Sequence, residues 1–281
     1  MTFLIEKKTE ENAVSRGTYT LLQLFCPSFP KDGLFYANGE GEHMEFKWTE
    51  QAYRWFVDAS NYTGYNKKLA ELLLSEMPAG GTLCDLGCGA ALVDFELAPF
   101  FSELTCVDIS PEVIRLVNKQ ICQRGIAHMR ALCADTQRLD GSWDIVMALL
   151  HGGPESVIPY LKMAKKALVI ATHGTKTGKI GPENRRIQKS WDVNSMRAFL
   201  EKRKIRFSLL ESAQEYGQPL TDLDEAKAFV RAYAAPMGEM ELDAYLRTAL
   251  RKTGRDDFPY YLPNERTLGI FVIRRSENEE I

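Results

Sequence analysis

The sequence contains no apolar run long enough to cross a membrane. None of its runs approaches the roughly 18 apolar residues that such a helix needs, and residues 1–11 contain no apolar signal core. Of its 281 residues, 45% are apolar and 26% are charged, proportions typical of an ordinary soluble protein. We therefore expect a cytoplasmic protein with no membrane partner.

The chain also has no large excess of charge of either sign. Its 35 Lys and Arg residues nearly balance its 38 Asp and Glu residues, which gives a net charge of −3. Nucleic acids and anionic membranes usually attract basic surfaces. This balance predicts no nucleic-acid partner and leaves only a local basic patch open.

Cysteine is scarce, and its spacing is unlike that of a metal site. The chain has six cysteines and no C-x-x-C pattern. Cys84 and Cys88 are only four residues apart, but a strand and a turn are expected to separate them, so they would not face one metal ion. We predict reduced cysteines, mostly in the core, and no metal site.

Short apolar runs alternate with helical patterns from residue 82 onward. This alternation predicts an α/β protein with a mostly parallel sheet and right-handed crossovers. The expected strands are residues 82–86, 104–109, 129–134, 143–150, 167–172, 205–210 and 267–273. Residues 185–204 are expected to be largely helical, with an internal restart at Asp192 or Asn194. Two more helices are expected between the last two strands, at 222–235 and 239–252.

The first strand leads into a glycine turn, in the stretch Thr82-Leu83-Cys84-Asp85-Leu86-Gly87-Cys88-Gly89. Gly87 and Gly89 remove two Cβ atoms where the chain must turn sharply, so that a ligand can approach the backbone. The N-terminus of the following helix points its free N–H groups at the same place. Together these features predict a nucleotide-type pocket.

Asp108 ends the second strand, 19 residues after Gly89. An acid at this place in a doubly wound sheet can accept both ribose hydroxyls of a nucleoside. A dinucleotide site would carry a third glycine at position 92, which is Leu, and the carboxylate of Asp85 suits an ammonium group better than a pyrophosphate. Asp135 ends the third strand, where a contact to adenine would fall. An NAD-dependent oxidoreductase remains the alternative.

Four segments of the chain resemble motifs of the class I S-adenosylmethionine-dependent methyltransferases. They are Asp85-Leu86-Gly87-Cys88-Gly89, Val107-Asp108-Ile109-Ser110, Cys133-Ala134-Asp135-Thr136 and Trp143-Asp144-Ile145-Val146. The resemblance covers about residues 60–275 and implies a three-layer Rossmann-like fold with a seven-stranded sheet. It implies S-adenosylmethionine as the cofactor.

The resemblance also implies roles for individual residues. Asp85, Gly87, Cys88 and Gly89 would border the methionine part of the cofactor, and Asp108 would hold the ribose hydroxyls. Adenine and methyl-side contacts would come from Ile109, Asp135, Thr136, Leu149 and Tyr65.

His151 follows the fourth strand and is the best candidate for a catalytic base, because an imidazole titrates near neutral pH. Its alternative role is a hydrogen bond within the turn at residues 152–154. Other candidates for the substrate site are His173, Trp191, Tyr62, Tyr233 and Trp48. The loop Leu150-His151-Gly152-Gly153-Pro154 departs from the Asn-Pro-Pro-Tyr pattern of enzymes that methylate adenine or glutamine amines.

We therefore predict methyl transfer to a small molecule by a monomer or homodimer. Residues 1–60 would form an N-terminal arm or lid, and residues 61–275 the methyltransferase domain. A helical insertion at residues 218–255 would roof the acceptor site. The alternatives are a protein or RNA methyltransferase, an NAD-dependent oxidoreductase and a non-catalytic module that binds the cofactor.

Overall fold

The computed structural model describes residues 48–78, 80–175, 180–186 and 191–278. All of them belong to one compact unit, residues 46–281. Most of the predicted N-terminal arm, residues 1–47, lies outside the described residues. The predicted boundary at residue 60 falls inside a helix, Glu50–Thr63, and stays a prediction.

A seven-stranded sheet forms the centre of this unit, with the strand order β3-β2-β1-β4-β5-β10-β6. Five neighbouring strands pair in parallel, and β10 pairs antiparallel with both β5 and β6, so that β10 alone among the seven runs in the opposite direction. The strands are β1 Thr82–Leu86, β2 Glu103–Asp108, β3 Met129–Cys133, β4 Trp143–Leu149, β5 Ala164–His173, β6 Ser208–Glu215 and β10 Glu265–Arg274. This confirms the predicted fold class.

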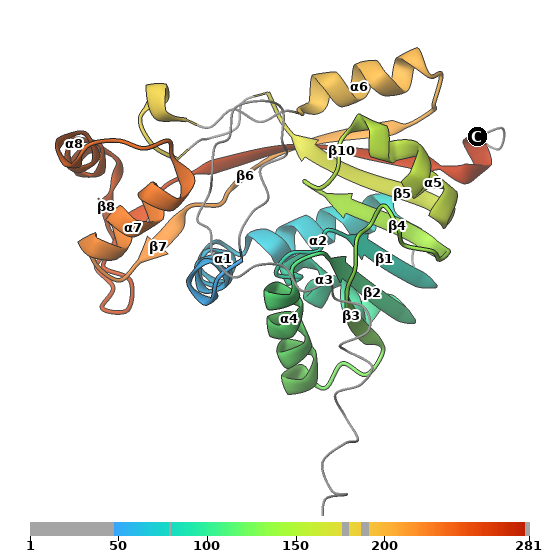
Figure 1. Ribbon diagram of the computed structural model, residues 1–281, viewed down its shortest axis with the longest axis horizontal. Coiled ribbons are helices and arrows are strands. Elements are labelled where there is room, and N and C mark those ends of the chain that lie inside the picture. The colour runs from blue at the N-terminus through green and yellow to red at the C-terminus, as the bar shows by residue number, and fades with distance from the viewer. Residues whose placement is uncertain (1–47, 79, 176–179, 187–190, 279–281) are drawn as a thin grey trace, which may run out of the picture. The chain divides into compact units, whose positions relative to one another are not determined.

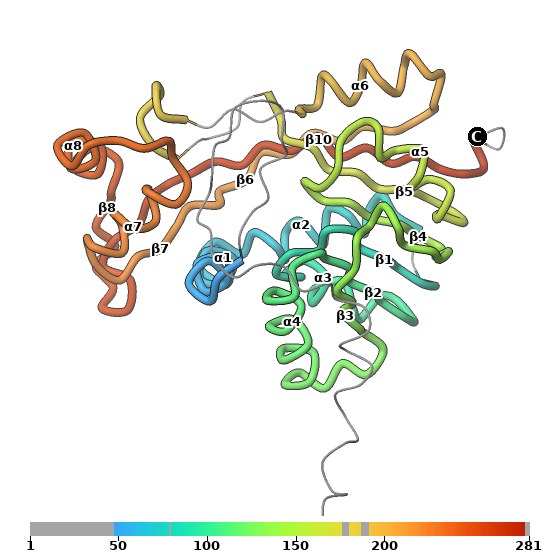
Figure 2. Tube along the Cα trace, in the orientation of Figure 1, coloured from blue at the N-terminus to red at the C-terminus, as the bar shows by residue number. Residues whose placement is uncertain are grey.

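Helices cover both faces of the sheet and make three layers (Figures 1 and 2). One core includes residues of α2, α3 and α4, and the opposite core includes residues of α5 and α6. Leu83 of β1 faces the first core and Cys84 faces the second, as the alternation of a strand requires. The helices are α1 Glu50–Thr63, α2 Tyr65–Glu76, α3 Leu92–Leu97, α4 Pro111–Arg124, α5 Val157–Met163 and α6 Val193–Lys202, with short 3₁₀ turns at Ala98–Phe100, Pro154–Ser156, Glu183–Arg185 and Arg275–Glu277.

The predicted helix over residues 185–204 was too long, and the sixth strand begins later than predicted. In the described part of this segment, α6 begins at Val193 because Asp192 and Ser195 form a capping box. It ends where Lys204 takes a left-handed conformation and Ile205 N–H donates to Leu200 O at 3.0 Å. Ile205, which was predicted to begin the sixth strand, is thus part of a Schellman motif that ends α6. No glycine marks this helix end in the sequence.

The insertion before β10 contains helices, as predicted, and also a small antiparallel sheet. Its helices are α7 Leu223–Tyr233 and α8 Glu239–Ala249. Its strands are β7 Gln218–Leu220, β8 Arg251–Lys252 and β9 Tyr260–Leu262, in the order β7-β9-β8. These elements have an apolar core of their own, which Trp55 of α1 joins, so the insertion packs on α1. We call residues 218–262 the cap.

Candidate functional site

The glycine turn after β1 is held against β2. Gly87 and Cys88 both donate their N–H groups to Val107 O, at 2.8 and 3.0 Å. Gly87 and Gly89 have positive φ angles of 73° and 52°. A Cβ atom on Gly87 would lie 2.1 Å from His151 Cγ, and one on Gly89 would lie 2.7 Å from Trp48 Cζ2. Only glycine fits at either position, and the two rings lie against the turn.

Asp108 fixes the geometry between this turn and the end of β2. Its Oδ2 accepts from Gly89 N–H and its Oδ1 from Ser110 N–H, both at 2.9 Å. The residue is only 9% exposed. Each carboxylate oxygen still has one free lone pair, so the carboxylate could also accept ribose hydroxyls.

Asp85 lies beneath the turn, beside a second buried carboxyl group, Asp94 of α3. Burial raises the pKa of Asp85 well above its usual value, and the charge of Asp94 raises it further. Burial also raises the pKa of Asp94, to about 7. Asp94 was not among the predicted site residues, although an acid between Val93 and Phe95 in an apolar stretch indicates a buried carboxyl group.

A chain of three polar side chains begins at His151. Its Nε2 lies 3.1 Å from Thr136 Oγ1, which lies 3.1 Å from Tyr160 OH. Burial lowers the pKa of His151, while the carboxylates of Asp108 and Asp135 act in the opposite direction. The imidazole is therefore neutral at physiological pH, as a proton acceptor must be.

The remaining predicted cofactor residues are placed around the same edge of the sheet. Ile109 follows β2 with 42% of its surface exposed, which leaves an apolar face beside Asp108. Asp135 accepts from Gln137 N–H at 2.9 Å, and Leu149 ends β4. Tyr65 is 3% exposed, and its ring packs on Tyr216 with centroids 4.4 Å apart.

The structure brings together only part of the predicted substrate set. Trp191 lies near the loop of His151, because its Nε1 is 2.8 Å from a Cβ atom built on Gly153. His173 ends β5 and forms an isolated bridge with Asp192. Tyr62 packs elsewhere, stacked on Tyr261 of the cap with ring centroids 4.9 Å apart.

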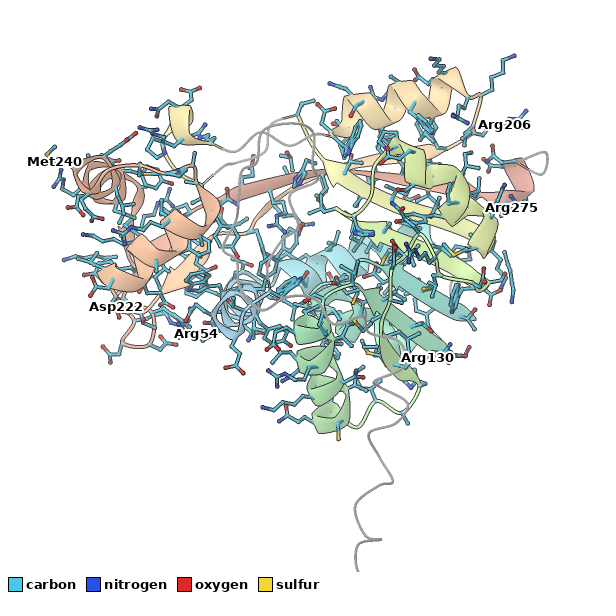
Figure 3. All side chains as sticks on the ribbon, in the orientation of Figure 1. Arg54, Arg130, Arg206, Asp222, Met240 and Arg275 are labelled. Atoms are coloured by element: carbon cyan, nitrogen blue, oxygen red, sulfur yellow. The ribbon has the colours of Figure 1, made fainter. Side chains whose placement is uncertain are left out.

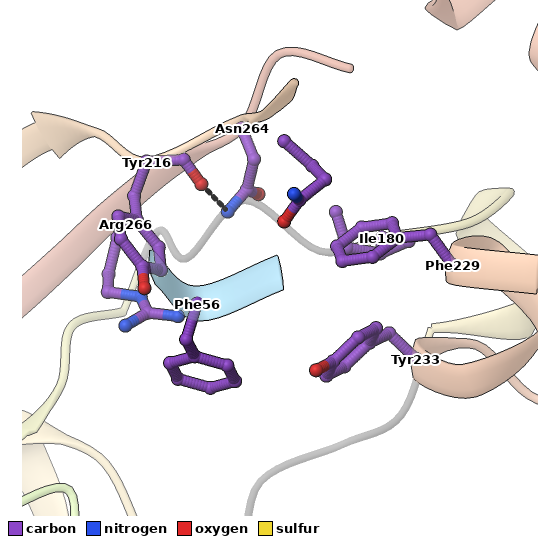
Figure 4. Close-up of a pocket in the computed structure, with 8 residues that line it drawn as sticks. Phe56, Ile180, Tyr216, Phe229, Tyr233, Asn264 and Arg266 are labelled. Atoms are coloured by element: carbon purple, nitrogen blue, oxygen red, sulfur yellow. Dashed lines mark hydrogen bonds between the residues drawn. The ribbon is translucent and has the colours of Figure 1, made fainter. Parts of the chain in front are cut away.

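A cavity lies between the cap and the sheet, with about 400 Å³ of space including the solvent at its mouth. Its lining residues come from α1, the segment after β5, the residue that follows β6, the cap, and the start of β10 with the residue before it. They are Phe56, Ile180, Tyr216, Gln218, Phe229, Tyr233, Asn264 and Arg266 (Figure 4). Tyr233 was a predicted wall residue, and the other seven were missed.

The cavity lies at the edge of the sheet that carries the glycine turn. Leu268 of β10 pairs with His173 at the carboxyl end of β5, so Arg266 lies beyond that end. Phe56 of the cavity packs on Trp48 with ring centroids 4.9 Å apart, and Trp48 touches Gly89. A continuous aromatic contact therefore joins the turn to the cavity.

Among the described residues, no group of His, Cys, Asp and Glu side chains could hold a metal ion. In the same part of the chain, no helix is long and apolar enough to span a membrane.

A family model described as "Methyltransferase domain" matches residues 83–169, the segment from β1 to β5. This segment carries the glycine turn, Asp108 and His151. Residues 83–169 are a methyltransferase domain. For this segment the match confirms the predicted methyltransferase family and enzyme class, with S-adenosylmethionine as the cofactor. No curated protein matches the sequence of this methyltransferase.

Solved structures similar to this methyltransferase include the YcgJ protein from Bacillus subtilis, at 14% identity and a TM-score of 0.47 over 75% of this chain and 98% of that one. A putative methyltransferase from Bacillus halodurans is 13% identical, with a TM-score of 0.49 over 75% and 99%. Magnesium protoporphyrin IX methyltransferase from Synechocystis, solved with bound S-adenosylmethionine, is 14% identical, with a TM-score of 0.43 over 81% and 86%. At these identities the similarities say nothing about the substrate.

Proposed function

We propose that this methyltransferase transfers the methyl group of S-adenosylmethionine to a small molecule that binds in the cavity beneath the cap. The observation that carries the proposal is the cavity itself, which has walls on several sides and is joined to the glycine turn through Trp48 and Phe56.

The residues around the turn fit the cofactor. Side chains at positions 87 and 89 would fill the cradle, and Asp85 is a buried carboxyl group whose Oδ1 makes no hydrogen bond of normal geometry within the described chain. In our proposal Asp85 faces the ammonium group, Asp108 accepts from the ribose hydroxyls, and Ile109 and Asp135 bind adenine. Bound there, the cofactor supplies a methyl group on a positively charged sulfur.

The chain's own contribution to the reaction is alignment, exclusion of water and removal of a proton. The cap and α1 hold the acceptor at the edge of the sheet where the glycine turn lies, which is the main requirement of an in-line methyl transfer. His151 Nδ1, which faces Gly87, takes the proton when the nucleophile carries one, since the buried imidazole is neutral and its Nε2 is engaged with Thr136. Thr136 and Tyr160 position that ring through their hydrogen bonds.

The alternatives differ in the acceptor and in the cofactor. A protein or RNA substrate would need an open, basic groove, whereas the cavity is walled by aromatic residues from several elements. An NAD-dependent oxidoreductase would lack the third glycine of its fingerprint here, because position 92 is Leu. These remain outcomes of the test below.

Two measurements separate these possibilities. Calorimetric titration should show binding of S-adenosylmethionine and none of NAD. Formation of S-adenosylhomocysteine should then be followed with a small-molecule extract, with total RNA and with a denatured protein mixture as acceptors. We expect turnover only with the small-molecule fraction. Turnover only with RNA or protein would overturn the proposed acceptor class. Binding of NAD without binding of S-adenosylmethionine would overturn the assignment of the cofactor.

A further inference from the structure

The chemistry of the cavity indicates which small molecules it accepts. Arg266 and Tyr216 lie on one side of the space, and Ile180, Phe229 and Tyr233 lie on the other (Figure 4). Five of the eight lining residues are apolar or aromatic, and one, Arg266, carries a full positive charge. This combination suits a flat, apolar molecule with one anionic group.

Arg266 is held in place by aromatic rings. Its guanidinium carbon lies 4.0 Å from the centroid of the Tyr216 ring and 5.5 Å from that of Tyr65. The two tyrosine rings pack on each other with centroids 4.4 Å apart, so the guanidinium rests on a rigid aromatic platform. Stacking of this kind, together with a hydrogen bond between Arg266 and the Tyr65 hydroxyl, orients the planar donor fork and leaves further N–H groups for a ligand.

Within the described part of the chain, Arg266 forms no ion pair with an Asp or Glu side chain. The nearby Glu215 is engaged elsewhere, since it accepts from Tyr261 OH at 2.5 Å and from Asn264 N–H at 3.3 Å. Three other arginines at the cap, Arg185, Arg231 and Arg255, each pair with a carboxylate, Arg185 with Glu241 at 2.9 Å. A half-buried guanidinium without a carboxylate is open to an anionic ligand.

The tyrosines do not neutralise this charge. Burial raises the pKa of Tyr216 to about 12 and also raises the pKa values of Tyr65 and Tyr233, although Arg266 acts to lower all three. All three hydroxyls therefore stay protonated at neutral pH. The positive charge of Arg266 is not compensated by a phenolate.

We propose that the methyl acceptor is an aromatic carboxylate and that Arg266 binds its carboxylate group while Phe56, Phe229 and Tyr233 enclose its ring. This inference rests on the proposed function, because it assigns the acceptor to the same cavity. A carboxylate matches the two parallel N–H donors of one guanidinium. The single positive charge favours a carboxylate over a doubly charged phosphate.

The test is a binding measurement in the presence of S-adenosylhomocysteine. The probes are benzoate, phenylacetate, 4-hydroxybenzoate and indole-3-carboxylate, each paired with its neutral amide. We expect at least one acid to bind at least tenfold more tightly than its amide. Equal binding of acids and amides would overturn the inference, and so would the absence of binding by every probe.

Variants locate the interaction. Arg266→Met should weaken binding of the acid at least tenfold and leave binding of the amide unchanged, and Arg266→Lys should fall between it and the wild type because the bidentate geometry is lost. The control is Arg206→Met, which removes an exposed positive charge just before β6, on the other side of the molecule (Figure 3). An equal loss in Arg206→Met would attribute the effect to net charge and overturn the role of Arg266.

Binding of S-adenosylhomocysteine separates this inference from the proposed function. It should be the same in the wild type and in Arg266→Met, which also shows that the variant is folded. If S-adenosylhomocysteine fails to bind while the acids bind through Arg266, the proposed function is wrong and the aromatic carboxylate site stands. If S-adenosylhomocysteine binds and the acids do not, the inference about the acceptor is wrong.

Discussion

Asp94 is a buried carboxyl group that takes no part in the proposed reaction. It has no exposed surface and lies beside Asp85, whose pKa it raises. Two carboxylates in an apolar environment cannot both ionise at low cost, so at least one of them binds a proton in the folded protein. Folding stability should therefore depend on pH through this pair.

We predict that Asp94→Asn becomes more stable than the wild type as the pH rises. The pKa of Asp94 is raised to about 7 in the folded protein, so the folded state binds a proton that the unfolded chain has lost above about pH 4. The contribution of the protonated carboxyl is complete below pH 4 and is lost as the pH rises through 7. Asparagine does not titrate and keeps its contribution.

The measurement is the melting temperature of both proteins between pH 5 and pH 8. Over this range the free energy of unfolding of the variant, relative to the wild type, should rise by about 1–3 kcal/mol. For a protein of this size that corresponds to a relative rise of roughly 2–10 °C in melting temperature. Asp140→Asn, which changes an exposed acid in a loop, serves as the control and should show no such trend. A constant difference across the pH range would mean that Asp94 is ionised throughout.

Asp108 is the residue on which the cofactor assignment depends most directly. We predict that Asp108→Ala weakens S-adenosylmethionine binding by about 1–3 kcal/mol, the usual cost of losing a charged hydrogen-bond partner. The variant also frees the N–H groups of Gly89 and Ser110, so its melting temperature should fall. Calorimetry at a temperature where both proteins are folded measures the affinity, with Asp140→Ala as the charge control. Unchanged affinity would refute the role of Asp108.

At the scale of the elements, the proposed base His151 lies in the loop after β4. Tyr160, which contacts it through Thr136, lies on α5. We predict that His151→Gln lowers kcat by about 10²–10⁴-fold for an acceptor whose nucleophile carries a proton. Because burial lowers the pKa of His151, wild-type kcat should be constant from pH 7 to 8 and should decline only below pH 6.5. This acidic limb should be absent in the variant.

Thr136→Val gives the matching test of the positioning chain. It removes the hydroxyl between His151 and Tyr160 and should lower kcat by about tenfold, with the affinity for S-adenosylmethionine unchanged. Tyr160→Phe, one step further from the base, should have a smaller effect. A weaker affinity for the cofactor in Thr136→Val, with kcat unchanged, would instead support its predicted contact with adenine.

Six strands of the sheet could be placed closely because each is an apolar run with its own boundaries, and the glycine turn because its spacing to Asp108 is characteristic. The sixth, β6, was placed three residues too early because most of its second half is polar. The strands of the cap could not, because two or three residues are too few to show an alternation. The cavity was missed for a different reason. Phe56, Tyr216 and Arg266 are far apart in the sequence, and only the packing of α1 on the cap brings them together.

At the scale of the whole molecule, the proposed function requires that the cap and α1 enclose the acceptor together. Glu225 of α7 is the main polar link between them. Its Oε1 accepts from Trp55 Nε1 at 3.0 Å and pairs with Arg54, both on α1, and its Oε2 accepts from Thr221 N–H at 2.7 Å. Burial alone would raise the pKa of Glu225, but these hydrogen bonds and the Arg54 charge lower it overall, so the carboxylate is charged at neutral pH.

We predict that Glu225→Ala raises the KM for the acceptor several-fold and leaves the affinity for S-adenosylmethionine unchanged. Without the carboxylate, the apolar contacts of Trp55 with Phe229 and Tyr233 still hold α1 against α7, at ring distances of 5.2 and 6.1 Å, but the Trp55 N–H loses its acceptor. The walls of the cavity that these two elements supply then move more freely, whereas the glycine turn on β1 is untouched. Steady-state kinetics with the acceptor and calorimetry with the cofactor measure the two effects separately.

Asp222→Ala, which removes the N-cap of the same helix, is the control for a general loss of α7 stability. A KM increase as large in Asp222→Ala as in Glu225→Ala would assign the effect to helix stability, and a weaker cofactor affinity would show that the cap also supports the cofactor site.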